Sequence, residues 1–204
     1  ITVPATAQPG GPYTICSSDV ANIVVTTTPG GGVWSGGQGS FGDASASSTT
    51  YTPGPGEAGT TVQLTWTTVD PDGTGPCPQV IASVGVNVLE AATALANGPY
   101  ATCGTDPVSI SASTNGVGQW SSSGSGTFGD ASAPATTYTP GVNEVGSTVT
   151  LTWETFDPDG GGPCTGAESS TDLVITVPAT AQPGGPYTIC SSDVANIAVT
   201  TTPG

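Results

Sequence analysis

Lysine, arginine, histidine and methionine are absent from this chain of 204 residues, which carries 15 aspartate and glutamate residues and a net charge of −15. Nucleic acids and anionic membranes attract clusters of Lys and Arg, so we expect neither as a partner. No apolar run approaches the roughly 18 residues that cross a bilayer, so no membrane insertion is expected. Without a histidine base, a lysine nucleophile or an arginine clamp, we expect no enzyme.

The most informative feature that is present is a sequence repeat of 87 residues. This offset relates three tyrosines and three cysteines, namely Tyr13, Tyr100 and Tyr187, and Cys16, Cys103 and Cys190. A fixed period of this length is typical of tandem domains.

Residues 1–30 and 175–204 differ at one aligned position, whereas the repeat between them is less similar, so the order is A, B, A. We predict the end of a preceding unit's last strand at 1–3, unit A at 4–90, unit B at 91–177 and the first part of a following unit A at 178–204. These residues are then a window on a longer alternating array. The alternative is a chain that was truncated.

Apolar residues alternate with a period of two wherever they cluster, and no segment has the 3.6-residue period of a helix, which predicts an all-β fold. In unit A we expect a strand that buries Val62, Leu64 and Trp66, a last strand over 80–88, and shorter strands at 13–16, 22–27, 32–35, 40–43 and 49–52. Seven short strands predict tandem immunoglobulin-like β-sandwich domains of about 87 residues. The proline-rich segment 4–12 is expected to be an extended linker that arranges the domains end to end.

Five cysteines in a chain without histidine indicate disulfides and an oxidising, extracellular compartment. Two pairings are open. Pairing inside each unit joins Cys16 to Cys77 and Cys103 to Cys164, whereas pairing between neighbouring units joins Cys77 to Cys103 and Cys164 to Cys190. We favour pairing inside the unit, because closing a loop of about 61 residues would stabilise a small domain by roughly 4 kcal/mol.

Asp70-Pro71-Asp72-Gly73 recurs as Asp157-Pro158-Asp159-Gly160, and this pattern is typical of a type I turn. A second interpretation is a calcium site, since no neighbouring Lys or Arg can neutralise the paired carboxylates. The ligands would be Asp70 and Asp72 in the first copy, and Asp157 and Asp159 in the second. No other cofactor is expected.

The four tryptophans have two possible roles. Trp66 and Trp153 are in phase with buried positions of their strands, so we place them in the core. Trp34 and Trp120 are either further core residues or exposed platforms on which sugars stack.

Several short runs resemble those of a known group of repeats. They are residues 7–16, Gly39-Ser40-Phe41, Tyr51-Thr52-Pro53, residues 62–66 and a Pro-Cys pair before the last strand. Together they resemble the PKD-like and immunoglobulin-like tandem repeats of bacterial extracellular adhesins and surface filaments. The resemblance implies a β-sandwich in an extracellular or cell-surface array with no activity of its own.

We therefore expect a structural repeat of an extracellular filament or adhesin stalk, whose partner is itself through neighbouring repeats or subunits. The alternative is a carbohydrate-binding adhesive module displayed on a stalk, which would bind surface glycans. Burial of Trp34 and Trp120 would favour the first function, and their exposure would favour the second.

Overall fold

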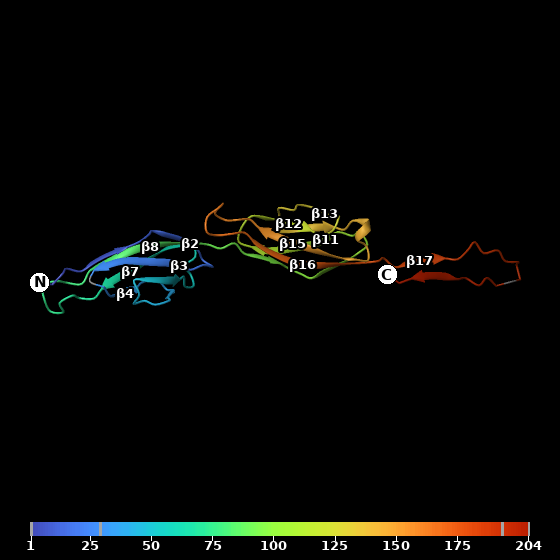
Figure 1. Cartoon of the computed structure of the whole chain (residues 1–204). Coiled ribbons are helices and arrows are strands. Elements are labelled where there is room, and N and C mark those ends of the chain that lie inside the picture. Colours follow the sequence, from blue (N-terminus) through green and yellow to red (C-terminus); the bar gives the residue numbers. More distant parts are fainter. Residues whose placement is uncertain (1, 29, 193, 204) are drawn as a thin grey trace. The chain divides into compact units, whose positions relative to one another are not determined.

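The computed structural model describes residues 2–28, 30–192 and 194–203 (Figure 1). It is built almost entirely of β-strands, and its contacts divide it into two compact units. The first unit comprises residues 1–92 together with 157–166, and the second comprises 93–156 together with 167–204. Among the described residues the helical segment is one short 3-10 turn, η1 (Val142–Glu144), and no helix there has the length and apolarity to cross a membrane.

The first unit contains two sheets of four strands each. One has the order β1-β3-β6-β5, and the other has the order β2-β8-β7-β4. Neighbouring strands are antiparallel except for β2 and β8, which are parallel. The strands are β1 (Thr6–Pro9), β2 (Tyr13–Cys16), β3 (Ala21–Thr28), β4 (Gly32–Ser35), β5 (Ser40–Phe41), β6 (Ser48–Thr52), β7 (Thr60–Thr68) and β8 (Ile81–Leu89).

The second unit repeats this topology, with the orders β9-β11-β14-β13 and β10-β16-β15-β12 and a parallel pair of β10 and β16. Its strands are β9 (Ala94–Ala96), β10 (Tyr100–Cys103), β11 (Val108–Thr114), β12 (Gly118–Ser122), β13 (Thr127–Phe128), β14 (Ala135–Thr139), β15 (Thr148–Thr155) and β16 (Ala167–Thr176). Both units have the strand order of immunoglobulin-like sandwiches. The predicted fold class, all-β and immunoglobulin-like, is confirmed.

A third copy of the repeat's beginning forms a hairpin of β17 (Thr180–Pro183) and β18 (Val199–Thr202). It pairs Thr180 with Thr202, which is the same register as Thr6 with Thr28 in the first unit. The repeated sequence therefore gives the same local pairing each time.

The core of each unit follows the alternation in the sequence. In β7, Val62, Leu64 and Trp66 are buried, and Trp66 meets Trp34 edge to face with ring centroids 5.3 Å apart. The second unit has the equivalent contact between Trp120 and Trp153 at 5.6 Å. Inward-facing residues of both sheets thus form one apolar cluster per unit.

Several predicted boundaries differ from the structure. The segment expected to be a linker contains β1, which pairs with β3 as an edge strand, where proline is tolerated because one side of the strand needs no ladder hydrogen bonds. The strand expected at 40–43 ends at Phe41, and β8 begins at Ile81. Of the strand end expected at 1–3, residues 2 and 3 lie in no strand and residue 1 is outside the described residues.

Candidate functional site

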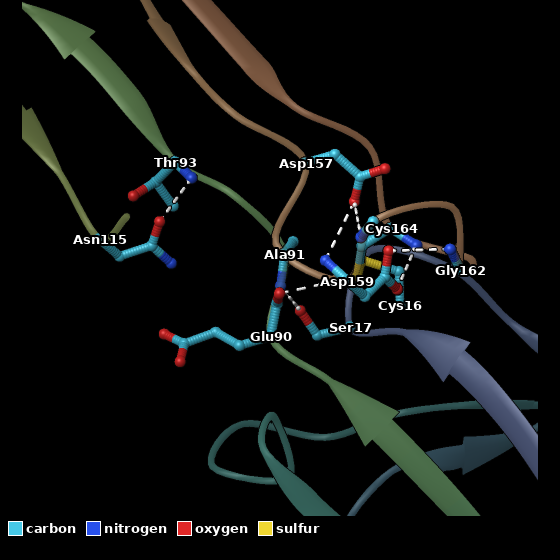
Figure 2. Close-up of a disulfide and its surroundings, with 11 residues drawn as sticks. Cys16, Ser17, Glu90, Ala91, Thr93, Asn115, Asp157, Asp159, Gly162 and Cys164 are labelled. Carbon is cyan, nitrogen blue, oxygen red and sulfur yellow. Dashed lines mark hydrogen bonds between the residues drawn. A yellow bond between two sulfur atoms is a disulfide. The ribbon is translucent and has the colours of Figure 1, made fainter. Parts of the chain in front are cut away.

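Among the described residues there is one disulfide, which joins Cys16 at the end of β2 to Cys164 in the loop between β15 and β16 (Figure 2). The Cα atoms are 4.9 Å apart and both cysteines are buried. This loop, residues 157–166, belongs to the first compact unit although its sequence lies in the second repeat. The bond therefore closes a chain segment of 148 residues.

The pairing expected inside each repeat is wrong for this bond, and so is the alternative that joined Cys164 to Cys190. The register explains why Cys16 does not meet Cys77. Cys16 lies beside Leu89 at the end of β8, whereas Cys77 precedes the first residue of β8. At about 3.3 Å per residue the strand separates them by roughly 26 Å, far beyond the Cα separation of a disulfide.

Backbone hydrogen bonds order the loop that carries Cys164, as Figure 2 shows. Asp157 accepts N–H bonds from Asp159, Gly160 and Gly161 at 3.0–3.1 Å. The bonds from Asp159, followed by those from the two glycines, lower the pKa of the Asp157 carboxyl group. Asp157 is therefore ionised at neutral pH without a cationic partner.

The second aspartate of this loop positions the cysteine itself. Asp159 accepts the N–H groups of Gly162 and Cys164, each at 3.1 Å, one on each carboxylate oxygen. The Cys164 sulfur lies 3.6 Å from the carbonyl oxygen of Glu90, and the neighbouring Ala91 donates its N–H to the Ser17 hydroxyl at 3.1 Å (Figure 2). The loop that carries Cys164, the end of β2 and the chain that follows β8 are thus packed together inside the first unit.

The equivalent acidic turn of the first repeat has a similar geometry. Asp70 accepts the N–H groups of Asp72 and Gly73, and Asp72 accepts that of Cys77 at 3.1 Å. These bonds fit the turn interpretation. The described residues contain no group of three or more His, Cys, Asp or Glu side chains arranged to bind a metal ion, and the calcium site at Asp70, Asp72, Asp157 and Asp159 stays a prediction.

The remaining cysteines differ in environment. Among the described residues Cys77, Cys103 and Cys190 are free thiols, and Cys103 and Cys190 are exposed. Burial is the largest cause of the raised pKa of Cys77. A hydrogen bond with Asp72 and the negative charges of Asp72 and Asp70 raise this pKa further. Cys77 is therefore mainly protonated at neutral pH.

A buried carboxylate in each unit was not predicted. The Glu57 side chain is 4% exposed and accepts the Gln38 and Gly54 N–H groups, each at 2.6 Å, together with the Tyr51 hydroxyl at 2.8–2.9 Å. Burial acts to raise the pKa of Glu57, but these hydrogen bonds together lower it below its usual value. Burial and the neighbouring Glu57 raise the pKa of Tyr51.

The second unit repeats this pair. Glu144 accepts hydrogen bonds from the Tyr138 hydroxyl and from the backbone N–H groups of Ser125, Gly126 and Gly141. Its pKa is lowered in the same way, by these bonds acting against burial. The signal in the sequence was the recurrence of Tyr-Thr-Pro-Gly-x-x-Glu at an offset of 87 residues.

Trp34 and Trp120 are 2% and 3% exposed, so neither ring offers a face to a sugar. Their indole N–H groups donate to the carbonyl oxygens of Ala46 and Pro134 inside their own units. Exposure of these two rings would have favoured a glycan-binding surface. Both rings are buried, which favours the structural role.

No known family model matches this chain, and no curated protein matches it. Solved structures with a similar arrangement include extracellular domains 3–5 of Drosophila OTK, the insect immune protein hemolin and mouse cadherin-23 EC22–24. Their sequences are 15%, 14% and 12% identical to this chain, with TM-scores of 0.44, 0.49 and 0.42.

The matches cover 86%, 87% and 88% of this chain, and 61%, 47% and 69% of the three structures respectively. The chain thus spans about three fifths of the OTK fragment and about half of hemolin.

Proposed function

We propose that this chain is a structural, non-catalytic repeat of an extracellular filament or adhesin stalk, of the kind suggested by its resemblance to PKD-like bacterial surface repeats. Its partner is itself, through neighbouring repeats or subunits. The observation that carries the proposal is the Cys16–Cys164 disulfide, which covalently joins two consecutive sequence repeats.

The position of this bond determines how tension passes along the chain. A force applied to the two ends reaches Cys16, crosses the sulfur bridge and continues from Cys164. The residues between the two cysteines carry little of that force, and they include β3 to β8 of the first unit and β9 to β15 of the second. The strands of both cores that lie between the two cysteines are therefore shielded from tension, which suits a stalk.

Two further properties support an extracellular location. A disulfide persists in oxidising compartments and is rare in the cytosol. The chain also contains no Lys or Arg, so trypsin-like proteases have no cleavage point. Both properties favour a protein exposed outside the cell for long periods.

Single-molecule pulling from both ends tests the proposal. For the oxidised chain we expect an unfolding extension that is shorter by the 148-residue sequence separation that the disulfide spans. Reduction, or the Cys16→Ser substitution, should add about 500 Å of contour length, at roughly 3.5 Å per residue. Cys190→Ser is the matched control and should behave as the wild type. Equal extensions before and after reduction would refute the mechanical role.

A further inference from the structure

Each cysteine of the observed disulfide has a counterpart in the other repeat, one at the end of a strand and one in an acidic loop. Cys103 ends β10 beside Thr176 of the parallel strand β16, as Cys16 ends β2 beside Leu89 of β8. The loop half recurs as Cys77, which is 87 residues before Cys164 in the sequence. Its N–H group donates to Asp72 at 3.1 Å, as the Cys164 N–H group donates to Asp159.

Cys103 and Cys77 differ from the bonded Cys16 and Cys164 in the way expected of cysteines whose disulfide partner is missing. Cys16 and Cys164 are 2% and 1% exposed, whereas Cys103 is exposed and Cys77 is partly so. In the bonded loop, Asp159 Oδ1 accepts the Gly162 N–H group. In the unbonded loop, the equivalent Asp72 Oδ1 is buried and has no hydrogen-bond partner among the described residues.

The chain beside Cys103 differs from the chain beside Cys16. After Cys16, the Ser17 hydroxyl accepts the N–H group of Ala91. The equivalent positions after Cys103 are Gly104 and Pro178, and proline has no N–H group to donate. A Cβ at Gly104 would lie 3.0 Å from the Pro178 ring, so the two positions suit each other. Each junction therefore has its own matched pair.

We propose that Cys103 forms the same disulfide with the Cys77-type loop cysteine of an A-type repeat that follows the second unit, so that every repeat of an alternating array is sulfur-linked to the next. This inference rests on the proposed function as a repeat array. The occupant of the Cys103 site is thus the acidic loop 70–77 of another copy of the first repeat.

The chemistry requires an oxidant, for which a small-molecule disulfide suffices. A cysteine thiolate attacks the small disulfide, forms a mixed disulfide and releases one small thiol. The second cysteine then attacks the mixed disulfide and releases the other small thiol. The two cysteines lose two electrons and two protons in all, which leave with the two small thiols.

The resulting links overlap along the chain. The segment enclosed by Cys16 and Cys164 contains Cys103, where the next link begins. Two equal paths run along such an array, one through the stretch from Cys164 to Cys190 and the other through the stretch from Cys77 to Cys103, and only these stretches carry tension in each 174-residue period. Fully extended, each stretch spans about 90 Å. An array linked in this way lengthens little before its sulfur bonds break.

The test is a chain lengthened by one period, in which residues 31–204 follow residue 204 again, refolded in a buffer of oxidised and reduced glutathione. We expect three free thiols per chain, the number found in the 204-residue protein, and a rise from one disulfide to three. Peptic peptides mapped by mass spectrometry should join Cys103 to Cys77 of the added copy. Cys103→Ser should remove that one link and raise the free thiols to four.

Pairing inside each repeat would instead leave one free thiol and four disulfides, and this count would overturn the inference, as would a Cys103 that stays free in the lengthened chain. A Cys103 that stays free leaves the proposed function intact if the Cys16–Cys164 bond still shortens the pulling extension, whereas pairing inside each repeat removes that bond and refutes both proposals. Loss of that shortening would refute the proposed function whatever the thiol count.

Discussion

At the scale of single residues, the buried glutamates Glu57 and Glu144 have an unusual environment. A buried carboxylate normally requires a cation or protonation, and this chain has no Lys, Arg or His. Backbone N–H groups and a tyrosine hydroxyl replace the cation in both units. Such charge-assisted bonds are about twice as strong as neutral ones. We infer that each glutamate fixes the loops around it.

The effect of substituting these glutamates on the free energy of unfolding should depend on pH. Glu57→Gln should lower the free energy of unfolding by about 1.5–3 kcal/mol at pH 7, since hydrogen bonds to a charged acceptor are replaced by neutral ones. The folded pKa of Glu57 is lowered, so its stabilisation is present above the unfolded pKa and is lost as the pH falls through the folded pKa. The difference between variant and wild type, measured by urea denaturation, should therefore shrink in acid.

The exposed Glu168 provides the control, and Glu168→Gln should change stability by less than about 0.5 kcal/mol. A Glu57→Gln effect that persists undiminished at pH 3 would contradict the assigned role of the charge. The pair itself could have been predicted from the sequence, because Glu57 and Glu144 recur at the repeat offset. Their burial could not, since it depends on how the loops around Gln38 and Gly54 fold back over the glutamate.

At the scale of strands and loops, alternation in the sequence was sufficient to find most of the sandwich. The strands at Tyr13–Cys16 and Gly32–Ser35 have the predicted bounds, and the buried face of β7 is the predicted one. The disulfide was mispredicted because pairing depends on which end of β8 each cysteine occupies. That is a property of strand register, and composition and spacing do not report it.

The loop that presents Cys164 should depend on Asp159. Asp159→Ala removes two backbone hydrogen bonds, each worth about 1 kcal/mol, so the loop should be less ordered before the bond forms. In a glutathione buffer we expect the equilibrium constant for the Cys16–Cys164 bond to fall by roughly tenfold or more. Thiol trapping and mass spectrometry measure the bonded fraction.

Asp130→Ala is the matched control for this loop, because Asp130 accepts bonds from Ser132 in another turn. It should leave the bonded fraction unchanged. The same assay examines the calcium prediction. If the acidic turns bind Ca²⁺, millimolar Ca²⁺ should shift the equilibrium relative to chelator in the wild type and not in Asp159→Ala. An unchanged equilibrium in both would dismiss that site.

At the scale of the whole molecule, the net charge of −15 has no compensating cation anywhere in the sequence. Copies of this chain therefore repel one another at neutral pH, and salt weakens that repulsion by screening it. The covalent links proposed above would act along the chain, so this repulsion does not oppose them once they are formed. It does oppose side-by-side association, and it favours single, separated copies at low ionic strength.

Lateral association should consequently depend on pH. As the pH falls through about 4, the ordinary pKa range of Asp and Glu, the exposed carboxylates are progressively protonated and the repulsion weakens. The pKa values of Glu57 and Glu144 are lowered, so the buried glutamates are protonated at lower pH than ordinary glutamates, and the chains that associate should still be folded. Sedimentation velocity should show monomers at pH 7 and larger species near pH 4, while tryptophan fluorescence remains that of the folded protein. Association that appears only together with a change in fluorescence would mean that acid unfolding, and not loss of repulsion, is its cause.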